Sequence, residues 1–164
     1  MSFLRSPRYL IVIAAVAMMI VVAIYAISAL LDTGSVTSPV PSTFTVNGKT
    51  YSFTYVATND AERSAGLMNK KVTNTTTMLF AFPGVGVYQF WMYDTNTSLD
   101  MIWVSATGDN GTVAYVYADA LPCYSYSGLT CPNYGAPPAN YVIEAKAGFA
   151  AANGIVVGTH VQFG

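Results

Sequence analysis

The stretch Phe90–Trp103 reads F-W-M-Y-D-T-N-T-S-L-D-M-I-W and contains both tryptophans of the chain. Tyr88–Tyr93 and Asp100–Ser105 have the short apolar character of strands, and a polar turn joins them. Two further apolar runs, Met78–Phe82 before the stretch and Thr112–Ala118 after it, predict strands that pack against it. We therefore expect this stretch to form the central hairpin of a β-sheet.

A second hairpin is predicted where the globular part of the chain begins. The segments Thr43–Val46 and Thr50–Ala57 flank Asn47-Gly48, a dipeptide that favours a two-residue turn with positive φ. Apolar and polar residues alternate in the second segment, which is the pattern of a strand with one buried face.

Two short helices are expected. Asn59 is placed to cap a helix, and Glu62, three residues later, completes a variant of the capping box. Gly66 should end this helix. An Ala-rich helix is expected at Ala147–Asn153, with Gly154 in the left-handed position that often follows a helix.

The remaining segments complete an α+β pattern. The long segment Leu121–Pro138, rich in Pro, Gly and Tyr, is expected to be irregular. Tyr141–Lys146 is expected to be a strand, and Ile155–Val157 with Thr159–Gln162 should supply the closing strand. Many short strands, tight turns and two small helices predict an α+β domain with a mainly antiparallel, barrel-like β-sheet.

An apolar segment precedes this domain. Residues 9–31 carry no charge and are long enough to span a membrane as a helix, and the two arginines in residues 1–8 predict that the N-terminus stays in the cytoplasm. Residues 32–42 are rich in Ser, Thr and Pro and should act as a linker to an extracytoplasmic domain at 43–164. A cleaved signal peptide remains the alternative, since Ala26-Ile27-Ser28 resembles a cleavage site.

The composition narrows the location and the partners. The net charge of −1 excludes a strongly basic surface, so no nucleic-acid partner is predicted. Ser, Thr, Asn and Tyr supply most of the polarity after the apolar segment, which favours a membrane-attached surface protein facing away from the cytoplasm. Three sequons make Asn74, Asn96 and Asn110 candidate glycosylation sites.

The two cysteines, Cys123 and Cys131, lie close together in the predicted irregular segment. In an oxidising compartment such a pair predicts a disulfide that closes a small loop. A two-thiolate metal site is the alternative, but structural zinc needs four nitrogen or sulfur ligands, and the only histidine, His160, is far along the chain.

No metal or cofactor is predicted. Several methionines could form a soft-metal site on one interpretation, but without a histidine or cysteine among them they are more simply core residues: these are Met68, Met78, Met92 and Met101.

Several sequence blocks, in order, resemble the uncharacterised family known as domain of unknown function 192. The blocks are Glu62-Arg63-Ser64-Ala65-Gly66-Leu67-Met68, Met78-Leu79-Phe80-Ala81-Phe82, Phe90-Trp91-Met92 with Thr95, Leu99-Asp100-Met101-Ile102-Trp103, Pro122-Cys123, Cys131-Pro132, Tyr141-Val142-Ile143-Glu144, Gly148, Gly154-Ile155 and Val157-Gly158. The two blocks with a cysteine resemble a cysteine-bearing variant of the family's central loop. This resemblance implies a small β-rich α+β fold in exported or membrane-attached proteins. It implies no established activity.

Asp100 is the strongest candidate for a catalytic or ligand-binding residue, and its position in the sequence allows two interpretations. It could be a general base or ligand contact beside Trp91, or a structural carboxylate that caps a turn or pairs with Arg63. The structural role is favoured, because a single Asp lacks the second carboxylate or histidine that most hydrolytic mechanisms need. Glu144 is expected at the polar end of a strand, bonded to backbone or to Lys146.

Aromatic side chains supply the best indication of function. Trp91, Tyr124, Tyr126 and Tyr134 are candidate binding residues, because exposed aromatic rings commonly contact sugars or proteins. We therefore predict a binding or envelope-interaction module for a glycan or protein, without catalysis. The alternatives are a hydrolase-type envelope enzyme using Asp100 and Arg63, and a structural subunit that polymerises through edge strands.

Overall fold

The computed structural model describes residues 15–23, 39–124 and 130–164. The chain divides into two compact units, Met1–Thr33 and Gly34–Gly164. Residues 15–23 are helical. None of the helices in the described ranges has the length and apolarity needed to cross a lipid bilayer. Much of the expected membrane span and linker lies outside the described residues.

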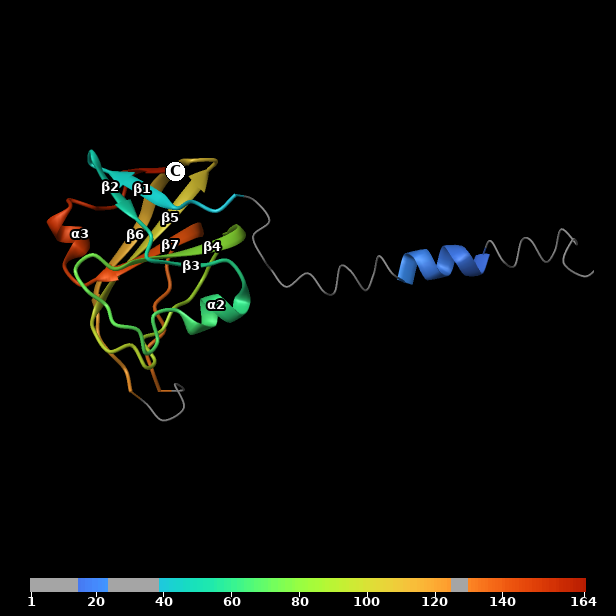
Figure 1. Ribbon diagram of the computed structural model, residues 1–164, viewed down its shortest axis with the longest axis horizontal. Coiled ribbons are helices and arrows are strands. Elements are labelled where there is room, and N and C mark those ends of the chain that lie inside the picture. The colour runs from blue at the N-terminus through green and yellow to red at the C-terminus, as the bar shows by residue number, and fades with distance from the viewer. Residues whose placement is uncertain (1–14, 24–38, 125–129) are drawn as a thin grey trace, which may run out of the picture. The chain divides into compact units, whose positions relative to one another are not determined.

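The second unit is built on a single curled sheet of eight strands, which forms a half-barrel (Figure 1). The strands are β1 (Thr43–Val46), β2 (Lys49–Ser52), β3 (Tyr55–Ala57), β4 (Thr77–Gly86), β5 (Leu99–Thr107), β6 (Asn110–Ala120), β7 (Ala139–Lys146) and β8 (His160–Phe163). Their order in the sheet is β2-β1-β8-β6-β5-β7-β4-β3. All pairs are antiparallel except β3–β4, which is parallel. The predicted α+β, mainly antiparallel, barrel-like fold is confirmed.

The two edges of the sheet approach each other because β2 and β3 are consecutive in the chain. β2 and β3 are the first and last strands in the order of the sheet, yet only two residues of the chain separate them. In this connection the Thr54 N–H donates to the Thr77 carbonyl at 2.8 Å, and the Thr77 hydroxyl donates to the Ser52 carbonyl at 2.8 Å. These bonds link the β2 end of the sheet to β4, so the short connection enforces the curl.

The first hairpin forms at the predicted turn, but its second arm, predicted as one strand over Thr50–Ala57, divides into β2, which pairs with β1, and β3, which pairs with β4. Asn47 and Gly48 both have positive φ, 48° and 76°, which is the requirement of a type I′ turn. The Asn47 side chain also donates from Nδ2 to the carbonyls of Asn153 and Gly154, at 2.8 and 3.1 Å. The turn residue therefore attaches the β1–β2 hairpin to the end of α3 (Phe149–Ala152).

The predicted central hairpin is wrong in one arm. Tyr88–Tyr93 is not a strand, and only two isolated bridges form within it, Phe90 to Tyr134 and Tyr93 to Cys123. The reason is that β5 is already paired on both sides, with β6 and with β7. The segment 88–93 therefore crosses a face of the sheet, where Phe90 and Met92 enter the core.

The predicted closing strand also starts later than expected. Residues 155–157 contribute no strand, and β8 begins at His160.

The core has two parts, one on each face of the central strands. Along β5, Met101 and Trp103 belong to one cluster, and Ile102 and Val104 belong to the other. β4 and β7 alternate in the same way between the two clusters. The chain around α2 (Asp60–Ala65) covers the first face, and α3 packs on the second through Ala150. Where β5 and β7 are buried on both faces, from Leu99 to Val104 and from Val142 to Ala145, no solvent-facing position is left for a polar side chain.

Asp100 on β5 lies on the second face, in phase with Ile102. Its side chain is 1% exposed. Oδ1 accepts a hydrogen bond from the Asp119 N–H at 3.0 Å, and Oδ2 accepts one from the Ala150 N–H at 2.8 Å. The carboxylate therefore connects β5 to the end of β6 and to α3.

Replacing Asp100 by Ala should lower the free energy of unfolding by about 3 kcal/mol, because the buried N–H of Ala150 and the part-buried N–H of Asp119 lose their acceptor. Urea denaturation of the two proteins measures the change. Asp109→Asn is the matched control, since this carboxylate lies exposed in the β5–β6 turn and its loss should cost less than about 0.5 kcal/mol. Similar stabilities for the two variants would contradict the structural role of Asp100.

Candidate ligand-binding cleft

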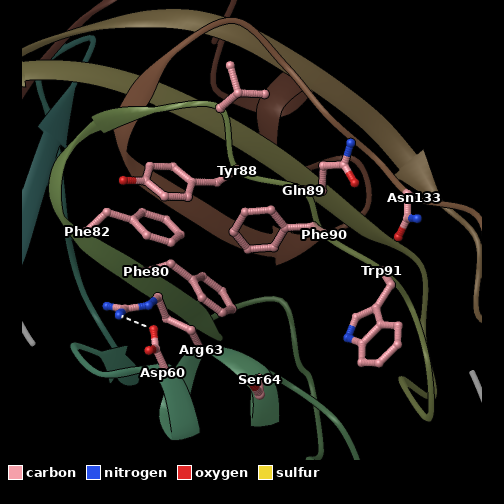
Figure 2. Close-up of a pocket in the computed structure, with 11 residues that line it drawn as sticks. Asp60, Arg63, Ser64, Phe80, Phe82, Tyr88, Gln89, Phe90, Trp91 and Asn133 are labelled. Carbon is pink, nitrogen blue, oxygen red and sulfur yellow. Dashed lines mark hydrogen bonds and ion pairs between the residues drawn. The ribbon is translucent and has the colours of Figure 1, made fainter. Parts of the chain in front are cut away.

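A cleft of about 570 Å³ opens between α2, β4 and the segment that follows β4 (Figure 2). Its lining combines aromatic and polar side chains: Asp60, Arg63, Ser64, Phe80, Phe82, Val87, Tyr88, Gln89, Phe90, Trp91 and Asn133. Figure 2 shows Gln89, Asn133 and Trp91 along one side of the cleft and the Asp60–Arg63 pair at another. A cavity of this size and mixed lining is typical of small-ligand sites.

The local sequence positions α2 at the edge of the cleft. Asn59 Oδ1 accepts from the Glu62 N–H at 2.9 Å, so the predicted cap is confirmed. The Glu62 carboxylate reaches back one residue further, to the Thr58 N–H at 2.7 Å and its hydroxyl at 3.0 Å. The hydrogen bond from the Thr58 backbone is the main cause of the lowered pKa of Glu62. This double cap orients the helix so that Arg63 faces β4.

Arg63 is held against β4. Its Nη2 forms an ion pair with Asp60 Oδ1 at 2.6 Å, and its Nη1 donates to the Ala81 carbonyl at 2.8 Å. The guanidinium also lies over the Phe82 ring, 5.1 Å from its centre. The side chain of Arg63 is 10% exposed, so these contacts hold a charged group in the wall of the cleft.

Stacked rings form the apolar part of the cleft. Phe82 and Tyr88 stack with centroids 3.5 Å apart, and Phe90 meets Phe80 edge-on at 4.8 Å. Trp91 differs from these rings because 41% of it is exposed. It lies 5.7 Å from the ring of Tyr93. Trp91 is therefore the ring best placed to meet a ligand.

The predicted disulfide is confirmed, with the Cα atoms of Cys123 and Cys131 5.8 Å apart. Both of its flanks hold the cleft segment. Phe90 and Tyr134 exchange two backbone hydrogen bonds of 2.8 Å, and the Cys123 N–H donates to the Met92 carbonyl at 3.2 Å. The disulfide thus connects the two chain segments, around Cys123 and around Tyr134, whose backbones hydrogen-bond to the segment that carries Trp91.

The candidate tyrosines have different environments. Tyr124 is 64% exposed, beside the disulfide and outside the cleft lining. Tyr134 is 8% exposed and packs edge-on against Tyr117 at 4.5 Å, and burial raises its pKa. Tyr134 therefore supports the cleft segment from inside and does not form an exposed binding surface. Tyr126 lies outside the described residues.

Glu144 lies beneath the cleft, which the sequence did not indicate. It is 3% exposed, and it faces the first cluster, in phase with Val142 on β7. Lys146, its expected partner, instead donates to Asn74 Oδ1 at 3.0 Å. The expectation of a polar strand end was wrong because β7 lies between β5 and β4 in the sheet. A Glu in phase with a buried Val, between two apolar neighbours, was the available signal.

The side chain of Glu144 lines a small recess that adjoins the cleft. The recess has a volume of about 20 Å³, and Thr95 and the turn after α2 also line it. Recess and cleft share five lining residues, which are Arg63, Ser64, Phe80, Phe90 and Trp91. Burial raises the pKa of Glu144 to about 8, although the positive charge of Lys70 lowers it. At pH 7 the carboxyl is therefore mostly protonated.

Asp100 and Arg63, the residues of the enzyme alternative, are not brought together. Arg63 lies on the cluster face that holds Phe80, whereas Asp100 bonds to Ala150 on the other face. Asp100 is also absent from the lining of the cleft and the recess.

Other predicted features can be placed on the described chain. Asn74, Asn96 and Asn110 are all exposed, and their glycosylation remains a prediction. Within the described ranges, no group of three or more His, Cys, Asp or Glu is placed to hold a metal ion.

These features define a small α+β half-barrel domain with an aromatic cleft over one face of its sheet. The chain belongs to the DUF192 family, described as an uncharacterised ACR, whose model matches residues 42–163. The resemblance seen in the sequence blocks is therefore confirmed.

Two solved structures are similar to this chain. A putative transcription regulator from Sinorhizobium meliloti 1021 is 24% identical, with a TM-score of 0.61, over 77% of this chain and 98% of its own. A protein of unknown function from Novosphingobium aromaticivorans DSM 12444 is 29% identical, with a TM-score of 0.60, over 75% of this chain and 84% of its own. No curated protein matches the chain.

Glu144→Gln should remove a pH-dependent loss of stability. Because the pKa of Glu144 is about 8 in the folded protein and 4.5 ordinarily, the folded state keeps a proton that the unfolded chain releases as pH rises between these values. The free energy of unfolding of the wild type should therefore fall across this range, by up to about 1.4 kcal/mol per pH unit from this group.

The Gln variant cannot ionise at this position. Relative to the wild type, it should gain stability as pH rises from about 5 to about 8, and urea denaturation at both values measures this. Parallel pH profiles for the two proteins would show that Glu144 is not held neutral.

Replacing Cys123 and Cys131 together by Ser should cost about 2–3 kcal/mol of stability and loosen the cleft segment. Relative to the wild type, backbone hydrogen exchange should speed up more at residues 88–95 than in β5, because the flanks of the disulfide hold this segment. Faster exchange spread evenly over both regions would contradict a specific role in the cleft.

Proposed function

We propose that this protein is a binding module whose cleft takes a ligand with an apolar ring face and polar edges, of which an envelope glycan is the best example. The observation that carries the proposal is the exposed Trp91 in a cleft with planar polar side chains. An aromatic ring can pack on the apolar face of a sugar, while Gln89 and Asn133 offer hydrogen bonds to hydroxyl groups.

The location proposed for this module is the outer side of a membrane. The uncharged residues 9–31, preceded by two arginines, support an N-terminal anchor. The disulfide supports an oxidising compartment, where such bonds persist.

The geometry gives less support to the alternatives. A hydrolase that uses Asp100 and Arg63 would need the two side chains at one site, whereas they face opposite clusters and both Asp100 oxygens already accept backbone hydrogen bonds. Polymerisation through edge strands would have to use β2 and β3, which have four and three residues and are tied together by their short connection.

A thermal-shift screen tests the proposal. The full chain is screened against envelope glycans, peptides and divalent metals, with EDTA added to the metal samples. A bound glycan should raise the melting temperature of the wild type, and Trp91→Ala should weaken its binding by about tenfold or more.

Tyr124→Ala is the matched control, because this ring is exposed but lies outside the cleft lining. It should bind like the wild type. A ligand that stabilises Trp91→Ala fully, or a metal effect that EDTA abolishes without any glycan binding, would overturn the proposed function.

A further inference from the structure

Glu144 is a buried carboxyl group without a partner among the described residues. It forms no side-chain hydrogen bond or ion pair there, and no hydrogen bond contributes to its pKa. Every fully buried side-chain oxygen or nitrogen atom in the described ranges does have a hydrogen-bond partner. The oxygens of Glu144 must therefore retain some contact with the open space of the recess.

The size of the recess limits what can enter it. Its volume of about 20 Å³ is close to what one water molecule needs, about 10–15 Å³. A single oxygen or nitrogen atom of a ligand fits, and a whole ring does not. Since the recess shares five lining residues with the cleft, a ligand ring beside Trp91 can extend one small group towards Glu144.

The surrounding charges select the kind of group. Among the described residues, the charged side chain that acts on Glu144 is Lys70, whose positive charge lowers the pKa of its carboxyl. Arg63 lines the same recess, but its guanidinium is held by Asp60 and the Ala81 carbonyl. Lys70 Nζ donates to the Gly66 carbonyl, so its charge has no acidic partner in the described ranges. The positive charge of Lys70 and a protonated carboxyl attract a hydrogen-bond acceptor and disfavour an ammonium group.

We propose that the Glu144 carboxyl group donates a hydrogen bond to the carbonyl oxygen of an acetamido group on an N-acetylated sugar bound in the cleft. This inference rests on the proposed binding function and adds the class of ligand that the cleft recognises, an N-acetylated sugar. A sugar ring occupies the cleft beside Trp91, and the acetamido oxygen enters the recess. The use of a neutral buried acid as a hydrogen-bond donor in an apolar site is chemically established.

Two matched probes test this: tri-N-acetylchitotriose and its deacetylated form, chitotriose. They share the same sugar chain, but the first presents carbonyl oxygens and the second presents ammonium groups. Calorimetric titration of the full chain should show that the acetylated probe binds at least about tenfold more tightly, the equivalent of one good hydrogen bond.

Two variants separate the donor from its surroundings. Glu144→Leu should weaken binding of the acetylated probe by about tenfold, because the carbonyl loses its donor. Glu144→Gln should bind within about threefold of the wild type at pH 6, because its amide N–H₂ still donates a hydrogen bond.

The pH profile gives a readout that does not depend on the Leu variant folding. Above about pH 8 the wild type should lose affinity for the acetylated probe as Glu144 ionises, by at most about tenfold per pH unit. Glu144→Gln should not show this loss.

The outcomes distinguish this inference from the proposed function. If the acetylated probe binds through Trp91 but neither Glu144 variant nor pH alters its affinity, the binding function stands and the role of Glu144 is wrong. Tighter binding of chitotriose than of the acetylated probe would overturn the inference, since it would mean that an ionised Glu144 binds an ammonium group. If neither probe nor any ligand of the screen binds, both proposals fail.

Discussion

The burial of the central strands on both faces is the constraint on which the rest of the domain depends. Because β5 and β7 have a strand on each side and a core cluster on each face, an acidic residue in their buried stretches must enter the interior. Two do so, in opposite directions. Asp100 on the second face obtains two backbone N–H donors and becomes a structural connection. Glu144 on the first face obtains none, and burial keeps it protonated near neutral pH.

The same constraint explains the cleft. Since β5 has no free edge, the segment 88–95 has to lie across the first face and cannot extend the sheet. A segment without a strand partner needs other support, which the flanks of the disulfide and the buried ring of Tyr134 supply. Trp91 is left exposed above the rings of this face, and the gap to α2 becomes the cleft.

Local patterns in the sequence predicted the parts of the fold that depend on neighbouring residues. Asn47-Gly48 required a turn with positive φ, Asn59 capped α2, and the two cysteines formed a short loop closure. The prediction failed where the competing partner was distant in sequence. Residues 88–93 have the composition of a strand, but they cannot pair with β5, because β6 and β7 already occupy its two edges.

The sequence by itself determined the fold class, the family, the first hairpin, the cap of α2 and the disulfide, because each of these rests on short-range chemistry or on an ordered set of motifs. Only the tertiary structure decided the site. It separated Asp100 from Arg63 by placing them on opposite faces, buried Tyr134, and brought Glu144 beneath Trp91. Which face of a strand is exposed depends on what packs on it, and that packing is made by segments far apart in the chain.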